Sequence, residues 1–418
     1  MSKVSEVVKL RDEMIEHVGS LSRDDQRIWL AAKVQLEGRN KADPLQQMEI
    51  AFARVLWVRS KFHTDYRDGV TNLRLAHEFF AKLSGENRLL GFLKKDVAIL
   101  WGNFCHDNEV FDEAIEHYQE ALQHETNPDR KALALLNLAR TYLRTKRFYQ
   151  ALDHAERVQV DTLQKDHLRQ TFFLLKARIL LVLGYTTLAS KPLHDVLAVP
   201  ELTSRVQIEA RYLEIASKVS DQEFIAAKPH YEALITLLDQ SGSESSANFY
   251  RLEWMQFAAL LEAETIGSRK TFLQRTGYLA RQVERADLHE LARHLLQISS
   301  GDKYAKEDFI ALQGVLAELR GRGEHLFYRQ ILVQIAFVLI KLQHYDKASE
   351  ILREIEIYYQ VGEALIPPKL AAMLGQHENT LIQTMTLLEG NCQPTYAPKN
   401  IPLVGFCFKP WSSCNAEL

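Results

Sequence analysis

The sequence feature that most constrains the fold is a pattern of large and small residues between positions 97 and 158 that recurs after 37 residues. The first copy consists of Trp101, Gly102, Cys105, Phe111, Ala114, Tyr118 and Ala121, and the second of Leu138, Ala139, Tyr142, Phe148, Ala151, Ala155 and Val158. Small residues at equivalent places allow the two helices of one hairpin to approach closely, while the large residues fill the gaps. A hairpin of this size has too little core to be stable alone, so it must stack on a neighbour. The period therefore predicts an all-α solenoid of stacked antiparallel hairpins.

The same period continues along the chain. Ala151, Ala189 and Ala227 are 38 residues apart, which predicts further hairpins over about 170–197 and 204–238. A degenerate copy covers 44–83, and a clear one returns late with Ala336, Tyr345 and Ala348. We expect five alanines at close helix contacts: Ala114, Ala151, Ala189, Ala227 and Ala348. No segment of useful length alternates apolar and polar residues as a strand would.

Two strings carry a family resemblance. WGNFCHDNEVFDEAIEHYQEAL and NLARTYLRTKRFYQALDHAERV resemble tetratricopeptide repeats (TPRs), with Cys105 where the family usually has Tyr. The resemblance implies a superhelix in which the first helix of each hairpin lines a concave face. It also implies a protein that binds a partner, and it does not point to any catalytic activity.

The domain organisation follows from where the pattern begins and ends. We expect an N-terminal helical cap or bundle over 1–45 and the solenoid over 46–366, with a hinge at the Ser- and Gly-rich stretch 241–247. A capping helix is expected over 367–389. The segment 390–418 contains four prolines and is expected to be extended or disordered.

Composition excludes several classes of function. The formal charge of −3, with 46% apolar and 25% charged residues, gives no global field that would recruit nucleic acid or an anionic membrane. No stretch approaches the ~20 apolar residues that span a bilayer. The first 14 residues lack the apolar run of a signal peptide. We therefore expect a soluble, cytoplasmic protein.

Enzyme, cofactor and metal signatures are missing. The chain has no phosphate-binding loop, no GxGxxG and no GxSxG motif. His289 and His294 are five residues apart, so they lie on different sides of a helix and are expected to face solvent rather than share a zinc ion. Cys407 and Cys414 lack a zinc-knuckle spacing, and free thiols are favoured over a metal site or a disulfide. The sequence thus predicts no catalytic residue, cofactor or metal.

The concave face supplies the candidate site. The resemblance places seven residues on first helices: Asn103, His106, Asp107, Asn137, Arg140, Arg144 and Arg178. Asn103 and Asn137 fall where family members with a carboxylate clamp carry asparagines, but Ile99, Thr171 and Leu175 stand at the clamp's basic positions. Arg140 and Arg144 share one helix face without a local acidic partner, and Arg178 should approach the same surface. Such arginines would suit an acidic protein or peptide ligand.

Two functional interpretations stay open, and a third, an enzyme, is improbable because the motifs are missing. The first is a scaffold or adaptor that holds a partner peptide or helix in the groove. The second is a peptide-responsive regulator, because bacterial peptide sensors such as the Rap phosphatases combine an N-terminal helical bundle with a similar solenoid. Compaction of the superhelix on binding a short peptide would favour the second. The sequence does not indicate the partner, the pathway or the oligomeric state.

Overall fold

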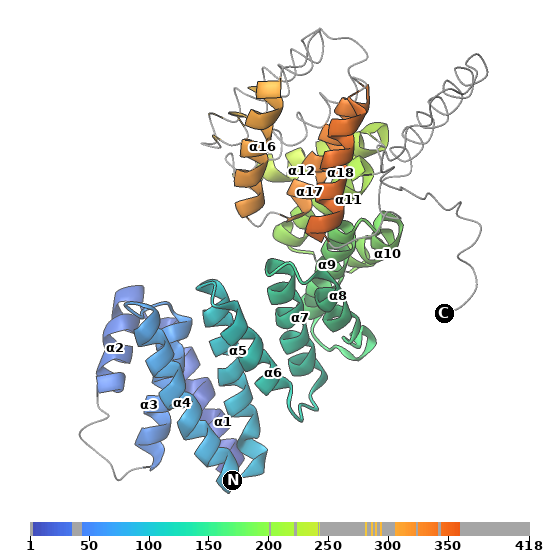
Figure 1. The fold of residues 1–418 in the computed structure, drawn as a ribbon. Helices are drawn as coiled ribbons and strands as arrows, with labels where there is room; N and C mark the ends of the chain where they lie inside the picture. Colours follow the sequence, from blue (N-terminus) through green and yellow to red (C-terminus); the bar gives the residue numbers. More distant parts are fainter. Residues whose placement is uncertain are drawn as a thin grey trace, which may run out of the picture. The chain divides into compact units, whose positions relative to one another are not determined.

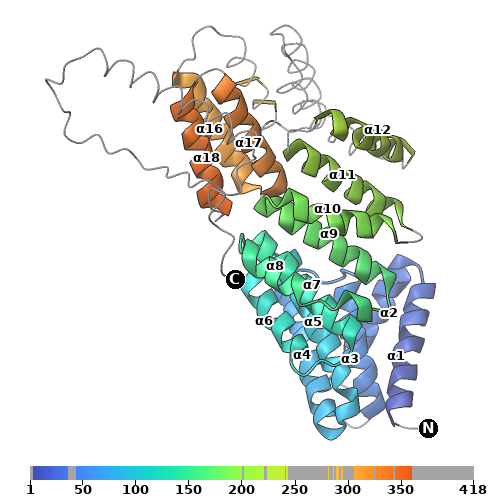
Figure 2. The same ribbon diagram turned by 90° about the vertical axis from the view of Figure 1, so that its right-hand side faces the viewer.

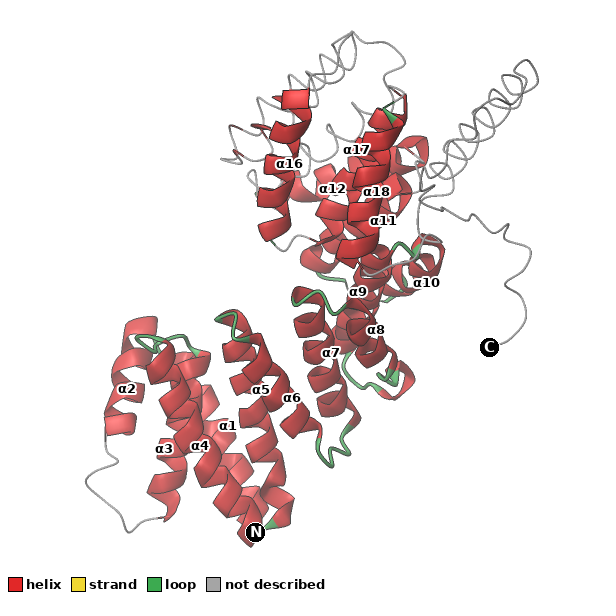
Figure 3. Cartoon of the chain, in the orientation of Figure 1, coloured by secondary structure: helices red, strands yellow, loops and turns green. Residues whose placement is uncertain are grey.

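The computed structural model describes residues 3–35, 44–199, 202–220, 224–240, 242, 281, 286, 289–290, 293–294, 306–322, 325–341 and 344–359 (Figure 1). Helices and short connections make up the whole of this described part, and no strand occurs in it (Figure 3). The chain divides into two compact units, Met1–Pro367 and Pro368–Leu418, and all described residues belong to the first. The predicted all-α class is confirmed.

The described helices form consecutive antiparallel hairpins. Two N-terminal helices, α1 (Lys3–Ser20) and α2 (Arg23–Gln35), precede them. The hairpins are α3 (Pro44–Arg59) with α4 (Tyr66–Glu86), α5 (Gly91–Asp107) with α6 (Phe111–Leu122), α7 (Pro128–Arg144) with α8 (Phe148–Glu156), α9 (Asp166–Leu183) with α10 (Thr186–Leu197), and α11 (Ser204–Ser220) with α12 (Phe224–Gln240). Short 3₁₀ turns, η2 (Arg88–Leu90) and η3 (Val160–Thr162), join some of them. Figure 2 shows these hairpins lying side by side, and each helix from α3 to α12 contacts the next.

Three helices are described further along the chain. They are α16 (Lys306–Gly321), α17 (His325–Lys341) and α18 (Tyr345–Tyr359), of which α17 and α18 form the late hairpin that the sequence predicts. Apart from Gly242, the expected hinge at 241–247 lies outside the described residues. The same is true of the capping helix at 367–389, the segment 390–418, and Cys407 and Cys414.

Small residues sit at the close helix contacts, as the repeat predicts. Ala114, Ala151, Ala189, Ala227 and Ala348 are all 0% exposed. A Cβ added at Gly102 would come within 2.5 Å of the ring of Tyr118, a side chain in the other helix of the same hairpin. The absence of a side chain at Gly102 is therefore what allows α5 and α6 to pack this closely.

The turns inside three hairpins also repeat. Glu109 (φ 62°), Lys146 (φ 63°) and Gly184 (φ 88°) adopt the left-handed conformation at the ends of α5, α7 and α9. In each turn the next amide donates to a carbonyl five residues back, as in Val110 N to Cys105 O at 2.9 Å and Tyr185 N to Leu180 O at 2.8 Å. This hydrogen-bonding pattern satisfies carbonyls that a helix end leaves unpaired. The period of 37 or 38 residues is thus a property of the backbone as well as of the core.

The N-terminal helices share their core with the first hairpins. One apolar cluster runs from Val7 and Met14 in α1 through Leu30 in α2 and Phe52 in α3 to Phe104 in α5. The predicted division at residue 45 stays a prediction, and no break in the core marks it.

The late hairpin makes contacts that a strictly sequential stack does not have. Helix α17 contacts α9 and α11, and Gln330 Nε2 donates to Ala216 O at 3.1 Å. Phe148 at the start of α8 packs against Tyr359, with 5.5 Å between ring centroids, and against His325 at 5.4 Å. Residues far apart in sequence therefore hold this part of the molecule together.

Candidate functional site

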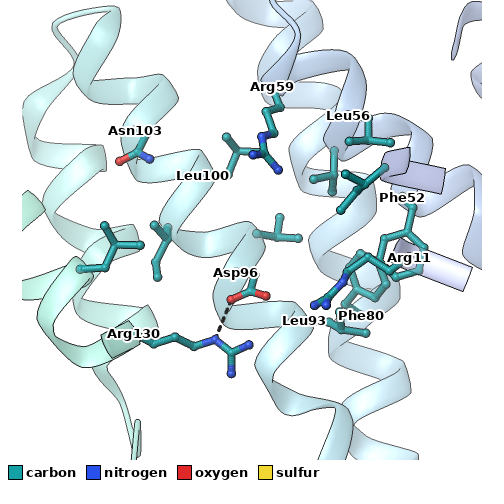
Figure 4. A pocket seen from close by; sticks show the side chains of 15 residues that line it. Arg11, Phe52, Leu56, Arg59, Phe80, Leu93, Asp96, Leu100, Asn103 and Arg130 are labelled. Carbon is teal, nitrogen blue, oxygen red and sulfur yellow. Dashed lines mark ion pairs between the residues drawn. The ribbon is translucent and has the colours of Figure 1, made fainter. Parts of the chain in front are cut away.

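A pocket of about 490 Å³ opens where α1 meets the first helices of three hairpins. Figure 4 shows its lining side chains converging from several helices. They are Arg11 and Ile15 of α1; Phe52, Val55, Leu56 and Arg59 of α3; Phe80 of α4; Leu93, Asp96, Val97, Ile99, Leu100 and Asn103 of α5; and Arg130 and Leu133 of α7. The pocket thus combines an apolar floor with charged side chains.

Helical spacing brings these side chains onto one surface. In α3, Phe52, Leu56 and Arg59 are four and three residues apart, which places them on one face. In α5, Leu93, Val97 and Leu100 have the same spacing. The hairpin stack sets α3, α5 and α7 next to one another, so their equivalent faces line one strip.

A second, smaller pocket of about 270 Å³ continues the first. The two share Arg59, Leu100 and Asn103, and the second adds Val58, Lys61, His63, Phe104, Asp107 and Asn108. We call the two pockets together the α3–α5 groove. Its length along α5, from Leu93 to Asn108, suits an extended segment better than a compact small molecule.

Charges in the groove are partly paired. Arg130 Nε lies 3.0 Å from Asp96 Oδ1, and Arg11 Nη2 lies 2.9 Å from Oδ1 of its neighbour Asp12. Burial raises the pKa of Asp96, although the guanidinium groups of Arg130 and Arg11 oppose that shift. Arg59 is exposed and has no ion-pair partner among the described residues.

Two predicted asparagines turn out to stabilise the hairpins. Asn103 Oδ1 accepts hydrogen bonds from Tyr118 Oη at 2.8 Å and from Asn137 Nδ2 at 2.9 Å, so it joins α5, α6 and α7. Asn137 is only 6% exposed. His106 Nδ1 lies 2.9 Å from Thr141 Oγ1, which likewise links α5 to α7. Much of the hydrogen-bonding capacity of Asn103, Asn137 and His106 is therefore used within the fold.

The predicted arginines differ from the expectation that all lack partners. Arg144 Nη2 lies 3.3 Å from Glu109 Oε1, and Arg178 Nη2 lies 2.9 Å from Glu209 Oε1. The expectation is wrong for these two because both partners come from neighbouring hairpins rather than from the adjacent sequence. Arg140 is exposed and has no ion pair within the described residues.

Three further observations bear on the other predicted residues and on metal binding. Asp107 lines the smaller pocket, whereas Arg140, Arg144 and Arg178 line neither pocket. The expectation that His294 faces solvent is wrong: it is 5% exposed, with Nε2 3.8 Å from Glu290 Oε2. No group of three His, Cys, Asp or Glu side chains in the described ranges could hold a metal ion.

The comparisons with known proteins bear on the repeat and on the fold. A family model described as a tetratricopeptide repeat matches residues 96–159, which span α5 to α8. These four helices of the chain are therefore tetratricopeptide repeats. No curated protein matches its sequence.

Several solved structures share the fold of this chain. A Rap protein in complex with competence and sporulation factor matches with a TM-score of 0.55 and 17% identity, over 88% of this chain and 99% of that one. Aspartyl phosphate phosphatase F from Bacillus subtilis matches with a TM-score of 0.53 and 15% identity, over 86% of this chain and 95% of that one. The apo form of the quorum sensor NprR from B. thuringiensis matches with a TM-score of 0.53 and 15% identity, over 85% of this chain and 99% of that one. At these identities the likeness shows a common helical solenoid.

Sequence reasoning missed most of the groove of this chain. Its predicted residues do not include Phe52, Arg59, Asp96 or Arg130, although the i, i+4 spacing of the apolar Phe52 and Leu56 in α3 was a usable signal. Arg11 had no such signal, because only the tertiary packing of α1 brings it to the pocket. Among the described helices, none combines the length and the apolar character that a membrane span requires.

Proposed function

We propose that this TPR protein is a cytoplasmic, peptide-responsive regulatory protein that binds a segment of its ligand in the α3–α5 groove. The observation that carries the proposal is the continuity of two pockets along the first helices of consecutive hairpins, joined at Arg59, Leu100 and Asn103. An extended peptide fits such a strip because apolar pockets take its side chains while polar groups along the rim meet its backbone.

The structural neighbours support a peptide as the ligand. One of them is a Rap protein solved with competence and sporulation factor, and another is called a quorum sensor. Both descriptions concern signal recognition by a solenoid of the same fold. The alternative is a passive scaffold that holds a partner protein without changing shape.

The decisive test uses Leu100, which lines both pockets. Selection from a library of random heptapeptides, followed by fluorescence polarisation, gives peptides with measurable affinity for the wild-type protein. Leu100→Glu replaces an apolar contact in the floor with a carboxylate and should weaken these peptides at least about 10-fold, because an apolar side chain of the ligand would then have to desolvate a charged group. Leu89→Glu is the matched control, since Leu89 is 73% exposed and lines neither pocket.

The same assay decides how far the ligand extends. Arg140→Glu combined with Arg144→Glu should abolish binding of peptides that continue onto α7 while the helical circular-dichroism signal is retained. Undiminished binding by the folded double variant would confine the ligand to the α3–α5 groove. Equal affinities for wild type and Leu100→Glu would contradict the proposed site.

Small-angle X-ray scattering separates a regulator from a scaffold. A peptide-responsive regulator should show a smaller radius of gyration with a selected peptide than without it, because ligand and compact state stabilise each other. An unchanged radius of gyration at saturating peptide would favour the passive scaffold.

A further inference from the structure

The charge of the α3–α5 groove is opposite to that of the whole chain. Four cationic side chains line it (Arg11, Arg59, Lys61 and Arg130) against two acidic ones (Asp96 and Asp107). The full sequence carries a formal charge of −3. A cationic strip in an acidic chain is a local feature of the groove and requires its own explanation.

Pairing within the fold accounts for only part of this charge. Asp96 is paired with Arg130, and Arg11 is paired with Asp12 outside the lining. Arg59 and Lys61 remain exposed, with no ion pair to any described residue. The position of Arg59 in the last turn of α3 suits the helix dipole, but the dipole leaves its guanidinium donors unused.

Arg59 also stands at the junction of the two pockets. It lines both of them, together with Leu100, and Figure 4 shows Arg59 and Leu100 on neighbouring helices beside the apolar side chains of Leu56 and Phe52. A ligand group that reaches Arg59 therefore lies next to the apolar floor. In an extended peptide the side chains of residues two positions apart point to the same face and are about 7 Å apart, so such a pair can use both features at once.

We infer that the α3–α5 groove selects an acidic peptide segment in which a bulky apolar residue stands two positions from Asp or Glu. The apolar side chain enters the pocket between α3 and α5, and the carboxylate on the same face of the peptide pairs with Arg59, with Lys61 lining the smaller pocket. Arginine suits this role because its planar guanidinium can donate two parallel hydrogen bonds to a carboxylate. This inference rests on the proposed function and adds the chemistry of the ligand.

The expected size of the effect is modest because Arg59 is exposed to solvent. Exposed ion pairs typically change an equilibrium constant by about 2- to 5-fold, and a well-oriented arginine–carboxylate pair by more. Apolar contacts should therefore supply most of the affinity, and the arginine should supply the preference for acidic peptides.

The test compares three pools of synthetic heptapeptides that differ only in charge. Each pool has Leu or Phe at the centre, flanked by Asp and Glu, by Asn and Gln, or by Lys and Arg. At low salt, the acidic pool should bind wild type about 5- to 10-fold more tightly than the neutral pool, and the basic pool should bind most weakly. Arg59→Glu should reverse the order, so that the basic pool binds better than the acidic one.

Arg67→Glu provides the matched control. Arg67 is an exposed arginine in the first turn of α4 that lines neither pocket, so the same change of total charge there should leave the order of the pools unchanged. An acidic preference that survives Arg59→Glu, or one lost equally in Arg67→Glu, would overturn the inference. Equal binding of the acidic and neutral pools to wild type would also overturn the inference. If the Leu100→Glu variant lost binding in that case, the proposed function would still be supported. Failure of all three pools to bind wild type would overturn both.

Discussion

At the scale of single residues, the contact between Gly102 and Tyr118 shows what the small positions of the repeat do. A Cβ at position 102 would overlap ring atoms of Tyr118, whose side chain is 2% exposed and whose hydroxyl donates to Asn103 Oδ1. The ring has little room to move. Gly102→Ala should therefore lower the free energy of unfolding by about 1–2 kcal/mol, because overpacking outweighs the gain in helix propensity. Denaturant-induced unfolding measures the change.

Gly314 is the control for this prediction. A Cβ there meets nothing within 4 Å and the residue lies inside α16. Gly314→Ala should raise stability by about 0.5–1 kcal/mol, because alanine is the better helix former. If Gly102→Ala raises the free energy of unfolding as Gly314→Ala does, the close contact between α5 and α6 does not require a glycine at position 102.

At the scale of elements, the turn that ends α9 depends on one backbone conformation. Gly184 has a φ of 88°, and its N–H donates to Leu181 O at 3.1 Å while the next amide reaches Leu180 O. A side chain at this φ is strained. Gly184→Ala should therefore cost about 1 kcal/mol and lower the melting temperature. Glu109→Gly, at the equivalent turn after α5, should not lower it, since glycine relieves the same conformation and only an exposed ion pair with Arg144 is lost. Equal losses in both variants would contradict this account.

At the scale of the whole molecule, His325 links the late hairpin to α8. It is 5% exposed, packs against Phe148, and its Nδ1 lies 3.1 Å from Tyr358 Oη. Burial, together with the charges of Lys146 and Arg144, lowers the pKa of His325 to about 4. Between about pH 6.5 and 4 the unfolded chain binds a proton at this site that the folded chain does not, so stability should fall as the pH is lowered through this range. The loss is of the order of 3 kcal/mol and should be absent above pH 6.5.

The comparison of variants isolates this histidine from other titrating groups. Thermal unfolding of His325→Gln between pH 7 and 4 should show a weaker pH dependence than wild type, because glutamine does not titrate. His194→Gln should keep the wild-type dependence, since the His194 side chain is 85% exposed. An unchanged slope in His325→Gln would show that other groups dominate the acid response.

Much of the fold could be predicted from sequence because its information is local. The positions of Ala114, Ala151 and Ala189 follow a period that spans one hairpin, and each hairpin packs mainly on its sequence neighbours. The candidate site was harder to predict. Asn137 was expected at the ligand surface but is buried, because hydrogen bonding to Asn103 satisfies it inside the stack.

The sequence by itself determined the helical class, the period, the hairpin boundaries and the small residues at the helix contacts, since these depend on propensity and spacing within about 40 residues. Only the tertiary structure decided that α1 completes the pocket with Arg11, and that Arg144 pairs with Glu109 while Arg59 stays unpaired. It also decided that Phe148 is covered by the late hairpin. Such features join residues from different hairpins, where the distance between side chains depends on how successive repeats are oriented, and the spacing of residues along one helix does not encode that orientation.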